Sequence, residues 1–494
     1  MMGASSVNLQ CVQCWKSNEI IKSTVIQSGG GAGEQHKLKK NKKTNEEGGG
    51  GGEEESRVLP MEEPMEEQKE LRVLELYSGI GGMHYALTVG ISSRWSLMDR
   101  REQVKRSAWG PSRLHGGTFS IWSPWRLSPL DSRQESGIPF QVVAAIDINT
   151  TANEIYSHNF PNTPVWNKTI EGIAVDDLNK LSFDLIVMSP PCQPFTRLGF
   201  KRDVSDARTK SFLHILDLLP RLNRLPSFIL LENVKGFETS SAREHLVETL
   251  TNCGYAFQEI MISPTSVGIP NSRLRYFLVA KFSTLKVRQT ILDAFPHPAE
   301  SDPSEKPTVL SAFLLGNCQP EEEEQASRVL YKVETMKDAQ KKLKQNSDLS
   351  LRQIQDFLEP HMDVNMEHYL LPPKTLLRYA LLLDIVRPTC RRSICFTKGY
   401  GRYVEGTGSV LQCCMETQME SVFKGLDGCT EEEKLQRLLK LKLRYFTPRE
   451  VANIMGFPPT FNFPEQISTK QRYKVLGNSL NVQVVARLLC LLVS

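Results

Sequence analysis

The sequence predicts an α/β fold with a Rossmann-like, doubly wound parallel sheet, and three observations predict it. Short apolar runs alternate with helical patterns from Leu71 onward. A glycine-rich turn follows the first apolar run, and polar residues follow the later runs. Strands that alternate with helices are typical of a parallel sheet that is covered on both faces. In such a sheet ligands bind at the carboxyl ends of the strands.

The first predicted strand is the apolar run Leu71–Leu76. It leads into Tyr77-Ser78-Gly79-Ile80-Gly81-Gly82 and then into a helical pattern that ends at Leu87. A glycine-rich turn between a strand and a helix lets main-chain N–H groups approach a ligand closely. The spacing does not match the dinucleotide-binding fingerprint, because its third glycine would fall at His84. A hydride-transfer enzyme is therefore disfavoured.

The second predicted strand, Val142–Ile146, ends in Asp147. An acidic residue at this place is expected to bind the ribose of a cofactor. It should follow the glycine turn by roughly twenty residues. Here the stretch from about 88 to 136 intervenes, rich in arginine, serine and tryptophan and without a clear hydrophobic period. We predict that this stretch is an insertion at the surface.

A cysteine follows the next predicted strand. The apolar run that ends at Met188 is stopped by Pro190-Pro191, and Cys192 comes next. A double proline ends a strand abruptly, which places the cysteine at the carboxyl end. A lone cysteine is more often a small core residue than a nucleophile. The prolines before it and the polar residues after it favour the nucleophile.

Polar residues also mark two later strands. The run Phe228–Leu231 ends at Glu232, which we expect on the same rim as the cysteine, although a helix N-terminus would equally suit a carboxylate there. Residues Ser272 to Ala280 open with two arginines at alternate positions. Alternation puts Arg273 and Arg275 on one face, where both could bind one anionic or carbonyl-rich ligand. A pair of surface arginines is the alternative.

Composition and charge limit the class of protein. The chain has 494 residues, 40% hydrophobic and 23% charged, and is long enough for about two or three domains. Its net charge of +4, from 60 basic and 56 acidic residues, permits a nucleic-acid partner without requiring one. The apolar run Tyr379–Val386 is too short to span a membrane and contains Asp384. No membrane partner is expected.

The eleven cysteines are scattered and follow no secretory signal, so we expect reduced thiols and a cytoplasmic protein. The lysine cluster Lys37–Lys43 is also consistent with a nuclear-localisation signal or an RNA-contacting patch, although such runs are usually neither. Cys11 and Cys14 form half of a zinc site, but no second pair follows at ligand spacing. We therefore predict no metal.

Five motifs then occur in a fixed order, and their order resembles the DNA-type cytosine-C5 methyltransferase superfamily. Within that superfamily, Cys395-Phe396-Thr397 and the surrounding residues 391–411 resemble the branch that methylates aspartate tRNA. The resemblance covers Leu71–Leu87 and about 138 to the C-terminus. The five motifs are Gly79-Ile80-Gly81-Gly82, Pro190-Pro191-Cys192-Gln193, Glu232-Asn233-Val234, Arg273-Leu274-Arg275 and Gly477-Asn478-Ser479.

The resemblance implies a chemistry for these residues. Cys192 would attack C6 of cytosine as a thiolate, so that C5 becomes nucleophilic and takes the methyl group. Glu232 would be protonated and bind N3, while Arg273 and Arg275 would hold the base at O2 and the adjacent backbone. The implied cofactor is S-adenosylmethionine. Its expected contacts are Ile80, Gly81, Gly82, Asp147, Ile170, Glu171, Ser189, Asn478 and Ser479, with Asn481 as a further candidate.

The resemblance also implies a domain order and a substrate. We expect a low-complexity, disordered tail at 1–70, a methyltransferase domain at 71–285, a target-recognition region at 286–440 and a returning C-terminal segment at 441–494. The charged runs 321–324 and 337–344 are expected to be mobile and solvated. The implied substrate is cytosine-38 in the anticodon loop of aspartate tRNA, where an unpaired base is easily extruded.

The target-recognition region contains basic and aromatic residues in alternation, as phosphate contacts and base stacking require. The candidate RNA contacts are Lys374, Arg378, Arg391, Arg392, Lys398, Tyr400 and Arg402, with Tyr403 beside them. A monomer is consistent with the sequence, which does not decide the oligomeric state.

Two other hypotheses stay open. A DNA methyltransferase would use the same catalytic residues. The chain could also bind nucleic acid without activity, if the insertion disorders the helix after the glycine turn.

Overall fold

The computed structural model describes residues 70–92, 139–191, 209–282, 308–309, 336–360 and 366–493, which all belong to one compact unit, Glu66–Ser494. The predicted tail, except residue 70, lies outside these ranges, and so does the half zinc site in it. The charged run 321–324 and most of the predicted insertion also lie outside them.

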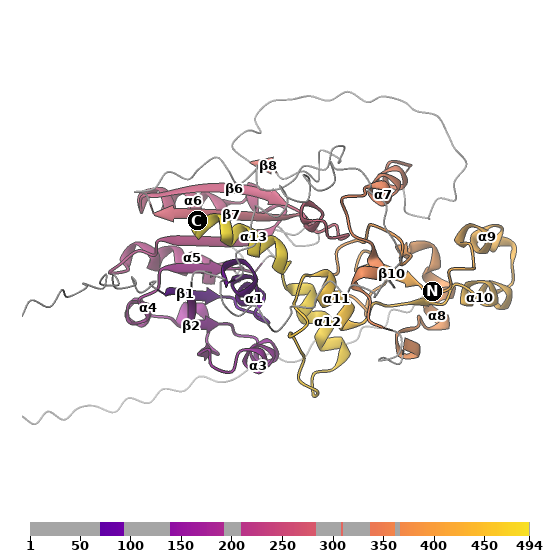
Figure 1. Ribbon diagram of the computed structural model, residues 1–494, viewed down its shortest axis with the longest axis horizontal. Helices are drawn as coiled ribbons and strands as arrows, with labels where there is room; N and C mark the ends of the chain where they lie inside the picture. Colours follow the sequence, from indigo (N-terminus) through magenta and orange to yellow (C-terminus); the bar gives the residue numbers. More distant parts are fainter. Residues whose placement is uncertain are drawn as a thin grey trace, which may run out of the picture. The chain divides into compact units, whose positions relative to one another are not determined.

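Within the described ranges, the larger sheet has eight strands in the order β3-β2-β1-β4-β5-β7-β6-β8 (Figure 1). Neighbouring strands from β3 to β5 pair in parallel, while β7 is antiparallel to both β5 and β6. The strands are β1 (Leu71–Leu76), β2 (Phe140–Ile146), β3 (Val165–Trp166), β4 (Leu185–Met188), β5 (Phe228–Val234), β6 (Tyr255–Ile262), β7 (Arg275–Phe282) and β8 (Thr308–Val309).

The predicted parallel sheet is therefore confirmed for its first five strands and wrong at one edge. There β6 and β7 follow each other along the chain and pair as antiparallel neighbours over eight residues each. Their connection is a short loop with one 3-10 turn, so no crossover helix intervenes. Without such a crossover two consecutive strands cannot pair in parallel.

Helices cover both faces of this sheet, as a doubly wound fold requires. One hydrophobic cluster contains Val73 of β1 and the other contains its neighbour Leu74, because successive strand residues point to opposite faces. The first face is covered by α1 (Gly82–Leu87), α3 (Thr150–Asn159) and α13 (Val482–Val493). The second is covered by α4 (Val175–Leu181), α5 (Lys210–Leu218) and α6 (Ser241–Asn252).

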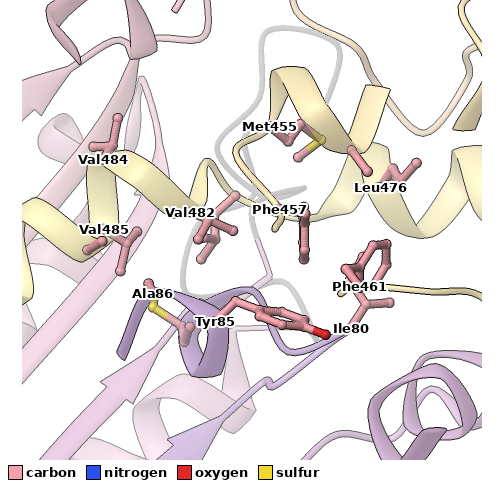
Figure 2. Packing of buried hydrophobic residues seen from close by; sticks show 14 of the residues in the cluster. Ile80, Tyr85, Ala86, Met455, Phe457, Phe461, Leu476, Val482, Val484 and Val485 are labelled. Carbon is pink, nitrogen blue, oxygen red and sulfur yellow. The ribbon is translucent and has the colours of Figure 1, made fainter. Parts of the chain in front are cut away.

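The C-terminal segment returns to this sheet. Helix α13 packs beside α1, and Tyr85 of α1 lies near Val482, Phe457 and Phe461 in the core shown in Figure 2. The helical stretch Thr469–Val493 is long and apolar enough to cross a membrane by length and composition, a feature that the sequence prediction missed. Most of its apolar side chains are buried inside the fold, as in the core helix of a soluble protein.

A second sheet of three strands, in the order β11-β10-β9, lies in the later part of the described chain. Its last strand falls just beyond the predicted end of the target-recognition region at 440, so the domain boundaries stay a prediction. The strands are β9 (Ile385–Val386), β10 (Val410–Gln412) and β11 (Leu443–Arg444). The remaining helices are α7 (Met336–Ser347), α8 (Pro373–Tyr379), α9 (Met419–Phe423), α10 (Glu431–Leu439), α11 (Pro448–Ile454) and α12 (Thr469–Asn478).

The first residues of the predicted insertion are part of the fold. Residues Thr88–Ser92 continue from α1 as a short π-helix, and Gly90 packs directly on α13. A Cβ at Gly90 would lie 2.4 Å from the carbonyl oxygen of Ala486, and the Cys490 thiol donates to the carbonyl of Gly90. The prediction of a surface insertion from residue 88 is therefore wrong for its first turn, and 93–136 lie outside the described residues.

The lysine-rich run 337–344 was predicted to be mobile and solvated. The structure contradicts this at Lys342, whereas Lys344 is exposed as predicted. The run lies in α7, and Nζ of Lys342 is 2.9 Å from Oδ1 of the buried Asp384. Helix α7 is held against the fold by this ion pair. The lysines looked solvated in the sequence because their buried anion lies far along the chain.

Candidate active site

The glycine turn lies between β1 and α1, as predicted. Gly79 and Gly81 have positive φ angles of 53° and 82°, a conformation that favours glycine. A Cβ at Gly81 would lie 2.5 Å from the ring of Phe160, whereas a Cβ at Gly79 would meet no atom of the described residues within 4 Å. The turn therefore packs on the fold at one glycine and has open space at the other.

Asp147 lies directly against this turn. Its Oδ2 accepts a hydrogen bond from Gly79 N at 2.9 Å, and its Oδ1 accepts from Asn149 N at 2.8 Å. Strands β1 and β2 pair in parallel along their length, with one register shift between Val73 and Leu74, and Leu71 N donates to Pro139 O at 2.7 Å. The insertion therefore leaves the two halves of the predicted cofactor site in contact. Helix α1 is also formed, contrary to the hypothesis that the insertion disorders it.

The other predicted cofactor contacts divide into two groups. Glu171 and Ser189 lie near Tyr77: Ser189 Oγ donates to Tyr77 O at 3.2 Å. Burial raises the pKa of Tyr77, and the negative charges of Glu171 and Asp147 raise it further, which places both carboxylates close to it. Ile80 and Ile170 are different, because their side chains are buried in the two hydrophobic clusters.

The C-terminal motif meets the glycine turn. A Cβ at Gly82 would lie 3.1 Å from Ser479 Oγ, and Asn478 is exposed beside it at the end of α12. Asn481 is buried and used internally, since its Nδ2 donates to Ile454 O at 3.2 Å and its Oδ1 accepts from Val484 N. The suggestion that the side chain of Asn481 closes the cofactor site is therefore wrong.

The residues around the turn fit a cofactor with polar and apolar parts. Ser78 Oγ is buried and has no hydrogen-bond partner within the described chain. Ile148 is 64% exposed directly after Asp147, so an apolar side chain and an acceptor lie together. The open space at Gly79 lies beside Asp147 and Ile148, because Gly79 N donates a hydrogen bond to Asp147. These features are consistent with S-adenosylmethionine, which has a ribose and an apolar adenine face.

Glu232 lies on the same rim of the sheet, within β5 rather than after it. Leu231 pairs with Met188 of β4, so Glu232 is level with the residues that lead from β4 toward Cys192. Asn233 Nδ2 donates to Pro190 O at 3.5 Å and ties the two strand ends together. Cys192 itself lies outside the described residues, and its role as nucleophile stays a prediction.

The carboxyl group of Glu232 is buried and faces an arginine. Nε of Arg275 is 3.3 Å from Glu232 Oε1. Burial raises the pKa of Glu232, while the charges of Arg275 and Arg273 oppose that rise without cancelling it. A protonated carboxyl group in a buried site of this kind can donate a hydrogen bond to a ring nitrogen.

Strand β7 begins at Arg275, so Arg273 precedes the strand and is not part of it as predicted. Both guanidinium groups nevertheless contact one atom, Sγ of Cys395, as the expected convergence of the two arginines requires. Arg273 is 5% exposed and donates to the carbonyl oxygens of Phe396, Gly477 and Ser479. Its guanidinium thus joins three segments that are distant in sequence. Binding of the base by Arg273 stays a prediction.

A thiol that the sequence marked only by resemblance lies between these arginines. Cys395 Sγ accepts from Arg273 Nη1 at 3.2 Å and from Arg275 Nη2 at 3.8 Å. Burial opposes ionisation of this thiol, but the charges of Arg273 and Arg275 outweigh burial and lower its pKa. The site therefore holds a polarised sulfur close to the Glu232 carboxyl group.

The predicted RNA contacts are not all at the surface. Lys374, Arg378, Lys398 and Arg402 are exposed, and Arg402 lies over the ring of Tyr403 at 5.0 Å. Arg392 is buried against Asp384, and Tyr400 is buried with its hydroxyl between Ser409 O and Phe446 N.

Arg392 and Tyr400 are therefore wrong as direct RNA contacts, because internal partners occupy their polar groups. Arg391 is partly buried and donates to Leu351 O. The alternation of charged and aromatic residues does not reveal which of them face inward. Asp384 lies inside the apolar run that ends at Val386. A carboxylate in such a run indicates that a cation is buried nearby.

Comparisons with known proteins show the family of this chain. The sequence pattern of the family described as C-5 cytosine-specific DNA methylase matches residues 131–492. A human protein named tRNA (cytosine(38)-C(5))-methyltransferase is 51% identical over 437 residues, which cover 85% of this chain and 99% of the human protein. A Dictyostelium discoideum protein named DNA (cytosine-5)-methyltransferase is 35% identical over 432 residues, covering 86% of this chain and 95% of that protein.

A solved structure supports the same assignment. The crystal structure of S. pombe Dnmt2 methyltransferase matches with a TM-score of 0.58 at 31% sequence identity, covering 86% of this chain and 98% of that one. The family pattern spans well over half of the sequence, and the described fold places the glycine turn, Asp147 and Glu232 on one rim. The chain belongs to the C-5 cytosine-specific DNA methylase family.

Proposed function

We propose that this protein transfers a methyl group from S-adenosylmethionine to C5 of cytosine-38 in the anticodon loop of aspartate tRNA. The observation that carries the proposal is the buried Glu232 carboxyl group beside Arg275, on the rim where the glycine turn meets Asp147. The name of the human relative supports position 38 for the cytosine. The match to this chain covers 99% of the human protein.

The residues of the chain divide the chemistry. Cys192 attacks C6 as a thiolate, and Glu232 donates a proton at N3, so that negative charge does not build up on the ring. Arg275 holds Glu232 in place through its Nε. The cations beside Cys395, Arg273 and Arg275, favour binding of the carbonyl oxygen of a base. When bound, S-adenosylmethionine would supply the methyl group as an electrophile. Loss of the proton from C5 then breaks the bond between C6 and Cys192, which restores the aromatic ring and releases the thiolate.

Asp147 and Ser479 would hold the cofactor from the two sides of the glycine turn. Asp147 is fixed by two main-chain donors and lies close enough to the turn to bind ribose hydroxyls. Ser479 lies against Gly82 and brings the C-terminal motif to the same place.

RNA would be bound by exposed basic residues of the later part of the chain. Lys398 directly follows the Cys395-Phe396-Thr397 segment, so a phosphate bound there would lie near the site. Arg402 and Tyr403 offer a cation beside an aromatic face, which suits an unpaired base. We also propose a cytoplasmic location for the protein.

Bisulfite sequencing of small RNAs incubated with the purified chain and S-adenosylmethionine tests the proposal. We expect one new 5-methylcytosine, at position 38 of aspartate tRNA. Cys192→Ala should abolish methylation and keep cofactor binding, measured by calorimetry. Cys390→Ala is the matched control, because this thiol is partly buried beside Arg387 N and away from the arginine pair. Retained turnover by Cys192→Ala would refute the nucleophile.

Methylation of duplex DNA is the second candidate function, and the Dictyostelium relative named as a DNA methyltransferase favours it. The two activities share the catalytic residues and differ only in what the exposed basic residues bind. Initial rates of methyl transfer to aspartate tRNA and to duplex DNA, at equal concentration and ionic strength, separate them. A higher rate on DNA would reject the tRNA proposal.

A further inference from the structure

A buried carboxylate lies between two cations at the start of β9. Nη1 of Arg392 is 2.8 and 3.0 Å from the two oxygens of Asp384, and Nζ of Lys342 is 2.9 Å from Oδ1. Ser409 Oγ donates to Oδ2 at 2.6 Å. Burial opposes the ionisation of Asp384, but the charges of Arg392 and Lys342 outweigh burial and lower its pKa. A buried charge with every oxygen bound holds its neighbours in one arrangement.

This carboxylate fixes the chain on both sides of Ser393. It binds Arg392 directly, and it orients the Ser409 hydroxyl, which accepts from Ile394 N at 2.9 Å. Ser393 in turn donates to Pro270 O at 2.6 Å. The residue after Ile394 is Cys395, whose thiol belongs to the candidate site. Asp384 therefore lies two hydrogen bonds away from the main chain that presents this thiol.

Helix α7 joins the same place from a separate part of the chain. Lys342 pairs with the carboxylate, Asn346 Oδ1 accepts from Arg391 N at 3.1 Å, and Gln345 Nε2 donates to Ser272 Oγ at 3.2 Å. One face of α7 thus contacts both segments that lead into the site: the one before the arginine pair and the one before the thiol.

We propose that Lys342 and Asp384 are positioning residues for the active site. Their ion pair holds segment 391–395 against residues 270–273, so that the Cys395 thiol and the Arg273 guanidinium stay beside Glu232. Neither residue touches the reacting atoms. The effect on turnover rests on the proposed function, whereas the effect on the geometry of the thiol does not.

Steady-state kinetics with aspartate tRNA tests the first effect. Lys342→Met should lower kcat roughly ten- to a hundredfold, because small displacements at a reacting centre have effects of this size. The KM for S-adenosylmethionine should change less than kcat, since the hydrogen bond between Gly79 and Asp147 involves no residue of α7. Lys342→Arg keeps the charge and should restore most of kcat. Lys344→Met, on the exposed part of α7, is the matched control.

Alkylation of Cys395 tests the geometry without any turnover. In a Cys192→Ala background, the rate of iodoacetamide labelling is followed against pH by mass spectrometry of the Cys395 peptide. The charged groups that face this sulfur are Arg273 and Arg275, with Glu232 beyond them. Lys342→Met should move the midpoint of labelling upward by about 0.5 to 1 pH unit, because the thiol moves away from its cations. Lys342→Arg should keep the midpoint.

The outcomes separate the possible failures. An unchanged midpoint and an unchanged kcat in Lys342→Met would overturn the positioning role. A shifted midpoint in a chain that does not methylate tRNA would keep the positioning role and reject the proposed function. Gln345→Ala, which removes the bond to Ser272 without touching the buried charge, is the second variant. It should move the midpoint in the same direction by a smaller amount. An unchanged midpoint in both variants would contradict the proposal that α7 positions the Cys395 thiol.

Discussion

Two carboxyl groups in the described chain have raised pKa values because they are buried, and they have different partners. Glu232 faces Arg275, whose charge opposes the rise. Glu75 lies inside β1 under the glycine turn and accepts from the Tyr156 hydroxyl at 2.7 Å. Burial raises the pKa of Glu75 to about 8. The first carboxyl group lies near the carboxyl end of β5 and keeps about a tenth of its side chain exposed, whereas the second is fully buried within the core.

Glu232→Gln should lower kcat by about two to four orders of magnitude, the usual contribution of a general acid. The wild-type rate should also fall as pH rises through the raised pKa of Glu232, because only the protonated form donates to N3. The variant should lack this alkaline limb. Rates of methyl transfer to aspartate tRNA across a pH series measure both effects. Cofactor binding by calorimetry should match that of the wild type, and an unchanged kcat would exclude Glu232 as the acid.

Glu75→Gln should change how stability depends on pH. The folded-state pKa of Glu75 is raised from 4.5 to about 8, so between these values the folded state binds a proton that the unfolded state has lost. The contribution of Glu75 to the free energy of unfolding is therefore fully present at low pH. It falls as pH rises toward 8, by up to about 1.4 kcal/mol per pH unit. The variant lacks this fall.

Chemical denaturation of wild type and Glu75→Gln at several pH values between 5 and 8 measures this difference. Glu248→Gln, on the exposed side of α6, is the control and should keep the wild-type slope. Parallel stability curves for wild type and Glu75→Gln would show that Glu75 is ionised throughout this range.

At the scale of elements, the fold depends on close contacts between segments that are distant in sequence. Gly477 of α12 is the tightest of these, since a Cβ there would lie 2.1 Å from Lys398 N and from the carbonyl carbon of Thr397. The helix therefore lies directly on the main chain that follows Cys395. A glycine inside a helix usually lowers its stability, so this one has a packing reason.

Gly477→Ala should destabilise the protein by about 1–3 kcal/mol, because overpacking against main chain has this effect. It should also reduce methyl transfer, since the Thr397 segment is displaced. Gly428→Ala is the matched control, because a Cβ at Gly428 would meet no atom within 4 Å among the residues that the structure describes. Thermal melting of the two variants compares them directly. Equal melting temperatures of the two variants would mean that α12 can shift without loss of stability.

Much of the sheet could be predicted from the sequence, because local patterns determine it. The apolar runs at Leu71 and Val142 are strands, and the glycine turn and Asp147 meet as expected. The antiparallel β7 could not be predicted, since strand direction depends on which neighbour a strand finds. The ion pair between Lys342 and Asp384 was also missed, because a lysine-rich run gives no sign of a distant buried anion.

At the scale of the whole molecule, the insertion enters and leaves the fold without separating the parts of the site. It begins after a turn that packs on α13 and returns at Pro139, beside the start of β1. The carboxyl ends of the strands, where the site lies, are at the other end of the sheet. The insertion is therefore compatible with a complete cofactor site.

Replacing residues 93–136 by a short glycine-serine linker should leave the affinity for S-adenosylmethionine unchanged, because Gly79 and Asp147 keep their hydrogen bond. Removing 88–136 should lower the melting temperature, since it also deletes the packing of Gly90 on α13. Calorimetric titration and thermal melting of both shortened proteins and the full chain test this. Heat of binding in the first shortened protein but not in the full chain would show that the insertion blocks the site.

The Arg273 guanidinium binds carbonyl oxygens that come late in the chain, at Phe396, Gly477 and Ser479. During translation Arg273 leaves the ribosome long before these acceptors exist. Water hydrates this cation in the nascent chain, and its protein acceptors replace that water only when the last helices emerge, so the site forms at the end of synthesis. Messages with premature stop codons before Gly477 should therefore yield chains without methyl-transfer activity.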